Sequence, residues 1–395
     1  MKLIERPVYL NRLLSLKGTP DIKVITGIRR AGKSRLMDAF SAELSKDESI
    51  HVTRINLRLK QFEALLDGDK LYDYVNASFR EGKKNFLLID EVQDASNFER
   101  IITSLLDEER FEIYLTGSNA FLLSSDLATL FGGRTINIHV YPFSFREYLA
   151  YFPDPNLQKA FDDYVMRGGM SGSYPYANPE DIRGYLSTVV RATVVKDVIK
   201  KYRLDNEPLL NLLVDFLMDN VGSQTSIRNI ARALTSHSYA TNDKTIGTYL
   251  DCLCKAYLFY PMSRYDIKGK KYLGSDKKYY LSDLGFRFAL LGTKNPDYGH
   301  LYENIVALEL RRRGYEVYVG ALYDKEIDFV AMKNGEKLYV QVSDNIGDPA
   351  TFEREVGPLL KVRDAFPKCV IARTRHPASQ YEGIQIFDIA EWLSQ

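Results

Sequence analysis

The strongest constraint on the fold of this chain is one octapeptide, Gly27-Ile28-Arg29-Arg30-Ala31-Gly32-Lys33-Ser34. It has the spacing GxxxxGKS, and it lies between a short apolar run, IKVITG (22–27), and a segment with helical spacing, Ser34 to Leu44. The two glycines let backbone N–H groups curl around phosphate oxygens, and the N-terminus of the following helix favours the same anion. Because a chance match would lack this strand–loop–helix context, the sequence predicts a phosphate-binding loop at residues 27–34.

Two side chains of this loop, a Walker A motif, have defined roles. Lys33 is expected to reach the β- and γ-phosphates of ATP, and the Ser34 hydroxyl is expected to ligate Mg²⁺. Arg29 and Arg30 are not required by the spacing. They either screen phosphate charge or form salt bridges with a lid, and the sequence leaves both alternatives open.

A second motif, FLLIDE, predicts the acidic half of the same site. Asp90 ends an apolar run, as does a Walker B aspartate that holds the Mg²⁺ shell. Glu91 follows at once, where a carboxylate orients and deprotonates the attacking water. An ordinary acidic turn after a strand is the alternative, but the pairing with the phosphate-binding loop favours ATP hydrolysis.

The region around these motifs has alternating strand and helix patterns. Further strands are expected at 51–57, 85–92, 111–118 and 135–141. This alternation predicts a parallel α/β sheet with right-handed crossovers over residues 1–142. After Pro142 the pattern becomes helical, which predicts a helical lid at 143–205. At the end of the strand at 111–118, Ser118 or Asn119 is expected to contact the γ-phosphate or the water, with simple turn chemistry as the alternative.

Composition excludes several classes of protein. The formal net charge is +1, so attraction to nucleic acid must come from local patches. The three cysteines, Cys252, Cys254 and Cys369, have no zinc-binding or disulfide spacing and suit a reducing cytoplasm. The sequence shows neither a signal peptide nor a long apolar run, so we expect a cytoplasmic protein with no membrane segment.

Residues 206–297 have the order of elements found in a winged-helix domain. Helical patterns at 207–220, 226–234 and 242–256 precede two strands around GKKYLGSDKK. In that fold the third helix enters the DNA major groove and the basic wing contacts phosphates. Candidate contacts to double-stranded DNA are Lys244, Thr245, Thr248 and Tyr249 on the helix, and Lys268, Lys270, Lys271, Lys277 and Lys278 on the wing. Docking of a protein partner, or a merely solvated charged hairpin, is the alternative.

Residues 298–395 show the pattern of a restriction-endonuclease-like domain, in which acidic side chains hold Mg²⁺ and a lysine assists the attacking water. Glu303 on a helix, Asp328 on a strand and Gln341 on the next strand fit this pattern. Ser343 stands where the lysine is required, and a neutral hydroxyl cannot supply that charge. We therefore expect a degenerate nuclease site, unless Lys325 or Lys337 substitutes in space.

Nearly the whole chain resembles the prokaryotic family of AAA-type ATPases that carry a C-terminal domain of unknown function with a restriction-endonuclease-like core. The resemblance rests on GIRRAGKS, FLLIDEVQ, LTGSNAFLLS, GGRTINIHVYPFSFREY, RGGMSGSYP, YLSDLGFRFALLG, LYENIVALEL, EIDFVA and YVQVS. It implies ATP binding, ATP hydrolysis and a role related to DNA or to defence.

Arg134 precedes the last predicted strand, where an ATPase of the AAA type has an arginine that completes a neighbour's site. That interpretation implies a homo-oligomer, and an intrachain contact is the alternative. For the whole chain, the sequence favours an ATP-driven DNA-binding protein. The alternatives are a nucleotide-dependent switch that binds protein partners and an ATP-dependent nuclease.

Overall fold

The computed structural model describes residues 4–117, 131–236, 241–294 and 296–395. These residues fall into two compact units, one ending at Val140 and the other running from Tyr141 to Gln395. The first unit ends two residues before the end of the α/β region predicted at residues 1–142.

The N-terminal unit contains a five-stranded sheet in the order β2-β3-β4-β1-β5, with every neighbouring pair parallel. This confirms the predicted parallel sheet. Its strands are β1 (Ile22–Thr26), β2 (Ile50–Asn56), β3 (Lys84–Asp90), β4 (Glu112–Thr116) and β5 (Thr135–His139).

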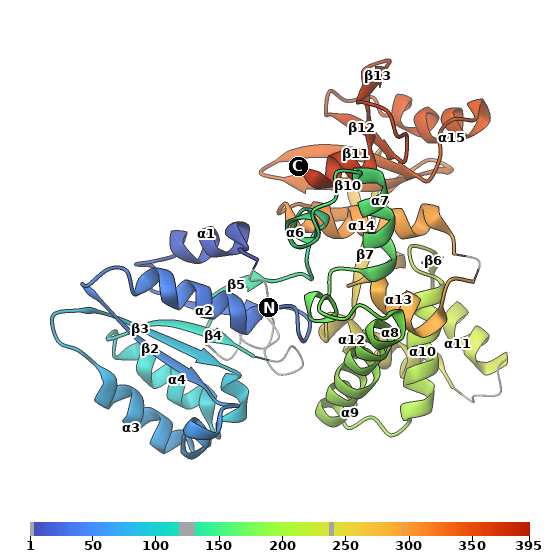
Figure 1. Ribbon diagram of the computed structural model, residues 1–395. Helices are drawn as coiled ribbons and strands as arrows, with labels where there is room; N and C mark the ends of the chain where they lie inside the picture. Colours follow the sequence, from blue (N-terminus) through green and yellow to red (C-terminus); the bar gives the residue numbers. More distant parts are fainter. Residues whose placement is uncertain (1–3, 118–130, 237–240, 295) are drawn as a thin grey trace. The chain divides into compact units, whose positions relative to one another are not determined.

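Helices cover both faces of this sheet (Figure 1). On one face Phe40 of α2 packs against Tyr114, and on the other Leu71 of α3 and Ile102 of α4 join a buried cluster with Leu87. The strands are buried on both faces, which explains why they are continuous apolar runs in the sequence. The helical segments are α1 (Pro7–Ser15), α2 (Lys33–Leu44), α3 (Gly68–Ser78) and α4 (Phe98–Asp107), with 3₁₀ turns at Lys60–Leu66 and Val92–Asp94.

The first part of the C-terminal unit is helical, as predicted after Pro142. A capping box begins α6, because Ser144 accepts a hydrogen bond from the Glu147 N–H while the Glu147 carboxylate accepts one from the Ser144 N–H. The helices are α6 (Phe145–Tyr151), α7 (Leu157–Arg167), α8 (Pro179–Ser187), a π-helix (Thr188–Val195), α9 (Lys196–Tyr202), α10 (Glu207–Asp219), α11 (Ile227–Ser236), α12 (Asp243–Lys255) and α13 (Leu284–Leu291), with a 3₁₀ turn at Ser171–Ser173.

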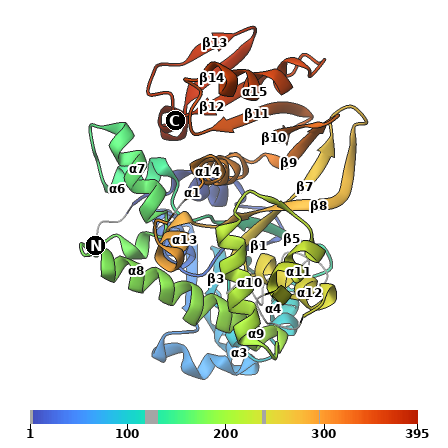
Figure 2. The same cartoon turned by 90° about the vertical axis from the view of Figure 1, so that its right-hand side faces the viewer.

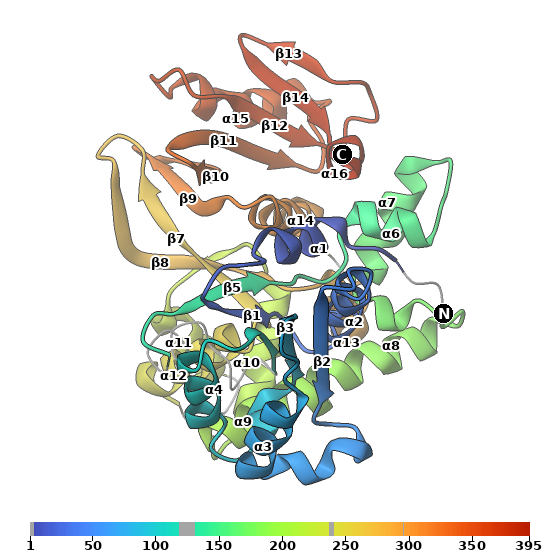
Figure 3. The same ribbon diagram turned by 90° about the vertical axis from the view of Figure 1, so that its left-hand side faces the viewer.

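The second part contains a sheet of nine strands in the order β13-β14-β12-β11-β10-β9-β7-β8-β6. Strand β7 pairs with β8 in an antiparallel hairpin and with β9 in parallel, so the sheet continues across the predicted boundary near residue 297 (Figures 2 and 3). Its strands are β6 (Gln224–Thr225), β7 (Phe259–Asp266), β8 (Lys271–Leu281), β9 (Glu316–Leu322), β10 (Lys325–Lys333), β11 (Glu336–Ser343), β12 (Lys368–Ala372), β13 (Ser379–Tyr381) and β14 (Ile384–Asp388). The helices beside this sheet are α14 (Tyr298–Arg312), α15 (Pro349–Leu360) and α16 (Ile389–Ser394).

The helices and hairpin between residues 206 and 281 follow the predicted order: α10, α11, α12, β7 and β8. Ser226 accepts a hydrogen bond from the Asn229 N–H at 3.1 Å, as expected of a residue that caps α11. The winged-helix interpretation of this segment stays a prediction. Over the described ranges, no helix combines the length and the apolar character needed to cross a bilayer.

Candidate functional site

The loop at residues 27–34 joins the end of β1 to the start of α2. Gly27 and Gly32 have φ values of 137° and 93°, a region that side-chain-bearing residues rarely adopt. A Cβ atom on Gly27 would lie 2.1 Å from the Val140 carbonyl oxygen, so only glycine fits there. Arg6 donates a hydrogen bond to the Ala31 carbonyl at 3.0 Å and supports the loop from outside.

The Lys33 side chain points into this loop. Its Nζ donates to the carbonyl oxygens of Gly27 at 2.8 Å and Ile28 at 3.1 Å. Burial lowers the pKa of Lys33 to about 8, while the carboxylates of Glu91 and Asp90 act in the opposite direction. The predicted acidic pair is therefore within electrostatic range of the loop.

Asp90 ends β3 at the same edge of the sheet, because all five strands are parallel. The Asp90 side chain is buried and accepts a hydrogen bond from the Thr116 hydroxyl at the end of β4. Arg54 of β2 lies 3.5 Å from its second carboxylate oxygen. Thr116 and Arg54 thus hold the carboxylate that was predicted to serve the Mg²⁺ shell.

Glu91 has a left-handed backbone, with φ at 59°, and its side chain is mostly buried. One carboxylate oxygen lies 3.0 Å from Nη2 of Arg58 and accepts a hydrogen bond from Gln93 at 2.7 Å. Arg58 lies two residues beyond the end of β2. The predicted base is thus held by an ion pair in this structure.

The remaining predicted residues of the loop and sheet differ in their exposure and contacts. Ser34 is half-buried at the start of α2, Arg29 is half-buried and Arg30 is exposed. Arg134 directly precedes β5 and forms an exposed ion pair with Asp107 at 2.8 Å. Ser118 and Asn119 lie outside the described residues.

Sequence reasoning missed Thr116, Arg54 and Arg58. Thr116 ends a strand whose neighbours in the sheet are β3 and β1, which carry Asp90 and the loop. A search for polar residues at the carboxyl ends of the predicted strands would have found it. The two arginines could be assigned only once β2 was known to pair with β3.

The predicted DNA contacts divide into exposed and buried groups. Lys244 and Thr248 of α12 are exposed, Thr245 is half-buried, and Lys268, Lys270 and Lys271 are exposed at the turn of the β7–β8 hairpin. Tyr249 is a correction: it is buried on the inner side of α12, where its hydroxyl accepts a hydrogen bond from the Asn206 N–H at 3.3 Å. Lys277 is half-buried, and Lys278 is also a correction because it is buried.

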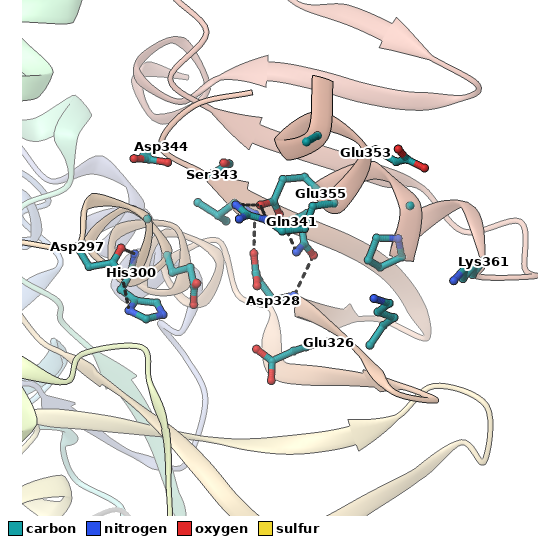
Figure 4. Close-up of a pocket in the computed structure, with 18 residues that line it drawn as sticks. Asp297, His300, Glu326, Asp328, Gln341, Ser343, Asp344, Glu353, Glu355 and Lys361 are labelled. Atoms are coloured by element: carbon teal, nitrogen blue, oxygen red, sulfur yellow. Dashed lines mark hydrogen bonds and ion pairs between the residues drawn. The ribbon is translucent and has the colours of Figure 1, made fainter. Parts of the chain in front are cut away.

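The acids of the predicted degenerate nuclease site meet at a cavity of about 750 Å³ (Figure 4). Glu303 comes from α14, Asp328 from β10, Gln341 and Ser343 from β11, and Glu355 from α15. The structure therefore brings together the predicted residues Glu303, Asp328 and Gln341.

A chain of hydrogen bonds orients these side chains. Oδ2 of Asp328 accepts a hydrogen bond from the Val342 N–H at 2.7 Å. Gln341 accepts one from the Asp328 N–H at 3.2 Å and donates one to Glu355 at 2.9 Å. Ser343 donates its hydroxyl to the Asn345 carbonyl at 2.9 Å, and a neutral hydroxyl supplies no positive charge to the acids.

The lysine beside these acids is Lys278 of β8. Its Nζ lies 3.1 Å from Glu303 and 2.7 Å from Glu326, and Tyr280 of the same strand donates a hydrogen bond to Glu303 at 3.1 Å. Lys337 is instead engaged with the Tyr265 hydroxyl at 2.9 Å. Lys325 lines the cavity as an exposed residue.

The charges of Lys278, Glu303 and Asp328 shift one another's pKa values. Burial by itself would lower the pKa of Lys278, but the carboxylates of Glu303, Asp328 and Glu326 outweigh it and raise that pKa. Burial raises the pKa of Glu303, and Lys278 opposes this rise. Burial, followed by the Glu303 carboxylate, raises the pKa of Asp328 well above its usual value. Within the described ranges, no three His, Cys, Asp or Glu side chains are grouped to hold a metal by themselves.

Comparisons with known proteins agree with the N-terminal geometry. A family model described as an AAA domain matches residues 19–149, and a model for a domain of unknown function (DUF8612) matches residues 158–297. An uncharacterized protein of Haemophilus influenzae is 35% identical over 400 residues, which covers 100% of this chain and 99% of that protein. The chain belongs to the same family as this Haemophilus protein.

Two further proteins are similar to this chain. The uncharacterized protein MJ1544 of Methanocaldococcus jannaschii is 27% identical over 379 residues, covering 90% of this chain and 82% of MJ1544. A solved structure, the Walker-type ATPase PABY2304 of Pyrococcus abyssi, is 15% identical with a TM-score of 0.49, over 73% of this chain and 96% of that one. Because the family model covers its sheet and its loop, the N-terminal unit is an AAA domain, a class that binds nucleotides.

Proposed function

We propose that this protein hydrolyses ATP in its AAA domain and binds duplex DNA through residues 206–297. The observation that carries the first part is the meeting of Lys33, Asp90 and Glu91 at one edge of the parallel sheet. A buried ammonium and two carboxylates beside a glycine loop suit the binding of a triphosphate with its divalent cation.

Each of these residues has a distinct role in ATP hydrolysis. Lys33 exchanges its bonds to the Gly27 and Ile28 carbonyls for bonds to the β- and γ-phosphates. Ser34 and Asp90 would hold Mg²⁺, which would neutralise the charge that develops on the phosphates. Glu91 accepts the proton of the attacking water, and for this its carboxylate must leave Arg58. Thr116 keeps the Asp90 carboxylate oriented.

The decisive experiment measures ATP turnover with and without duplex DNA, on a sample whose size is known. Turnover that requires Mg²⁺ and disappears in Lys33→Ala supports the proposal. A protein that binds ATP tightly and never releases phosphate, with or without DNA, would contradict the hydrolytic part.

The DNA part of the proposal rests on the exposed lysines. Lys268, Lys270 and Lys271 are exposed cations of one hairpin, and Lys244 and Thr248 lie exposed on α12. The whole chain has a net charge of only +1, so this local patch is the electrostatic feature that suits a phosphate backbone.

This part is tested by measuring duplex binding as a function of salt. Replacing Lys268, Lys270 and Lys271 with alanine should lower the affinity and reduce the slope of log K against log salt by about 0.9 for each phosphate that is no longer neutralised. A matched triple variant at Lys46, Lys60 and Lys70, three exposed lysines of the AAA domain, removes the same charge and should bind normally. An equal decrease in affinity in both variants would contradict a specific role for the wing.

The contribution of Arg134 to a neighbouring subunit is a separate proposal. Arg134 lies just before β5, and its exposed ion pair with Asp107 is the kind that contributes only about 0–1 kcal/mol, so it leaves readily for a stronger anion. Mixing Arg134→Ala with Lys33→Ala, each inactive alone, should restore turnover if the arginine acts between subunits. No recovery in a confirmed mixed oligomer would refute this proposal.

A further inference from the structure

Two tyrosines, Tyr272 and Tyr323, are the most exposed large hydrophobic side chains among the described residues, at 62% and 70%. Tyr272 lies at the start of β8, next to the β7–β8 turn, and Tyr323 lies in the turn between β9 and β10. The two turns are neighbours, because β7 pairs with β9 and the Ile267 N–H donates a hydrogen bond to the Ala321 carbonyl at 3.0 Å (Figure 3). Large rings exposed together are a mark of an interaction surface.

Three tyrosines from three adjacent strands form the centre of this surface, which we call the tyrosine platform. They are Tyr265 of β7, Tyr272 of β8 and Tyr318 of β9. The ring centroids of Tyr265 and Tyr272, which are directly opposite each other in the antiparallel pair, are 5.6 Å apart. The Tyr318 centroid lies 5.1 Å from that of Tyr272 and 6.2 Å from that of Tyr265. Since these separations are typical of attractive aromatic pairs, two other rings support the exposed ring of Tyr272.

The two inner rings of the platform are fixed by the fold. Tyr265 is buried in the hydrophobic core beside α15, and its hydroxyl accepts a hydrogen bond from Nζ of Lys337 at 2.9 Å. Tyr318 is half-buried and donates its hydroxyl to the Glu316 carboxylate at 3.0 Å. Because these rings are already ordered, a ligand that stacks on the platform loses less free energy to the ordering of side chains.

Lysine side chains are concentrated on the same two turns. Nζ of Lys268 lies 4.7 Å from the centroid of the Tyr323 ring, within the range of a cation–π interaction. The exposed lysines are Lys268, Lys270, Lys271 and Lys325, and the acids of the two turns are Asp266 and Asp324. Four cations against two carboxylates give this aromatic surface a local positive charge, which a polyanion complements.

We propose that the tyrosine platform and Tyr323 bind the unpaired bases of a single-stranded nucleic acid, while the lysines of the two turns contact its phosphates. Every base offers a π-face to an aromatic ring, and every nucleotide carries a negative charge. In a duplex the faces of the bases are covered by their neighbours, so a duplex engages the lysines and leaves the rings unused. The inference rests on the proposed DNA binding for the attraction of phosphate, and it specifies an unpaired strand as the partner.

The first test compares the affinity of the full chain for three labelled probes at the same salt concentration. They are a thymidine strand of about 12 nucleotides, within the usual site size of such surfaces, an equally long strand that lacks bases, and a blunt duplex. The base-free strand has the same phosphates but nothing to stack. The unaltered protein should therefore bind the thymidine strand at least about 5-fold more tightly than the base-free strand. Equal affinities for the two strands would overturn the proposal, because charge alone would then account for binding.

The second test replaces the exposed ring of the platform. Tyr272→Ala should weaken binding of the thymidine strand by about 5- to 150-fold, the usual effect of one stacked base, and should leave the base-free strand unaffected. Tyr272→Phe keeps the ring and should bind normally, whereas Tyr272→Leu, which is apolar without a ring, should bind more weakly than Tyr272→Phe. Tyr381→Ala is the matched control, because Tyr381 is an exposed tyrosine of β13 at the far edge of the same sheet. An equal loss in Tyr381→Ala would overturn the assignment to the platform.

Tyr323 is tested separately, because it comes from the other turn. Its backbone is left-handed, with φ at 56°, so Tyr323→Asn removes the ring with a residue that tolerates this conformation. This variant should also weaken binding of the thymidine strand and leave the base-free strand unaffected. Normal binding of both strands would overturn the role of Tyr323.

A uridine strand of the same length distinguishes RNA from DNA as the source of the unpaired bases. Binding of either strand that depends on Tyr272 supports the proposal, and the tighter of the two identifies the source. If neither strand binds and the protein self-associates through Tyr272, as measured by its size in solution, the surface is a contact between two copies and the proposal is overturned.

The duplex probe separates this inference from the proposed function. Duplex binding that depends on the wing lysines, with equal affinities for the thymidine and base-free strands, overturns the platform and leaves the proposed duplex binding intact. Binding of the thymidine strand through Tyr272, with no binding of the duplex, supports the platform and contradicts the proposed duplex binding.

Discussion

Lys33 and Lys278 are both buried lysines with carboxylates in range, yet their surroundings shift their pKa values in opposite directions. Lys33 is hydrogen-bonded to two backbone carbonyls, and burial lowers its pKa to about 8. Lys278 forms ion pairs with Glu303 and Glu326, and its pKa is raised. The difference lies in the nearest partner, which is a neutral dipole in one unit and a charge in the other.

The two lysines therefore differ in how far the protein itself compensates their positive charge. The charge of Lys33 is incompletely compensated, so a triphosphate can supply what the protein does not. The charge of Lys278 is matched within the fold, so its removal leaves buried carboxylates without a counter-ion. The following changes test the comparison, beginning with the largest expected effect.

Replacing Glu91 with glutamine should slow ATP turnover by about 10²–10⁴-fold, because the proton acceptor for the attacking water is lost. ATP binding should remain, since Lys33, Ser34 and Asp90 are intact. Single-turnover phosphate release and nucleotide titration measure the two quantities separately. Asp94→Asn is the control, because it removes an exposed carboxylate that contacts the same Arg58 at 3.6 Å. Normal turnover in Glu91→Gln would mean that another group is the base.

Lys278→Met should destabilise the C-terminal unit by about 3–5 kcal/mol, the usual cost of leaving a buried charge unpaired. Lys337→Met should cost about 1 kcal/mol, the value of one hydrogen bond. Urea unfolding followed by a probe in the C-terminal unit measures both. Adding Glu303→Gln to Lys278→Met should recover part of the lost stability, and strictly additive effects would show that the two charges are not coupled.

Thr116→Val should lower ATP turnover by about tenfold, equivalent to roughly 1.4 kcal/mol, because a hydrogen bond to the charged Asp90 is removed. Thr116→Ser retains the hydroxyl and should remain close to the unaltered rate. Steady-state phosphate release at saturating ATP and Mg²⁺ measures the effect. An equally slow rate in both variants would indicate that the methyl group matters and the hydroxyl does not.

The affinity for ATP should fall as the pH rises above about 8. The pKa of Lys33 is about 8 in the free protein, so above that pH the lysine must regain a proton to bind phosphate. The dissociation constant should increase by at most about tenfold for each pH unit. The increase should stop once the pH of the solution exceeds the pKa of Lys33 in the ATP-bound protein. Titrations between pH 7 and about 9.5 measure it, and Lys33→Arg should remove this dependence because arginine stays protonated. A flat profile in the unaltered protein would contradict the lowered pKa.

The side of a helix that faces the core was harder to predict than the helix itself. The pattern at 242–256 correctly predicted α12, and Lys244 and Thr248 are exposed as a DNA contact requires. Tyr249 is the adjacent residue, and it is buried against the start of α10. An aromatic ring with a polar tip suits either a groove of DNA or a protein core, so residue type could not decide.

The sequence by itself predicted the phosphate-binding loop, because residues 27–34 are contiguous and their spacing specifies a loop geometry that can surround a phosphate. It also located Asp90 and Glu91, since parallel strands bring their carboxyl ends to one edge whatever their order. Only the tertiary structure decided that Thr116 and Arg58 hold these acids and that Lys278 reaches Glu303. Those contacts depend on strand order and on strands distant in sequence, and no local pattern of residues encodes which strands become neighbours.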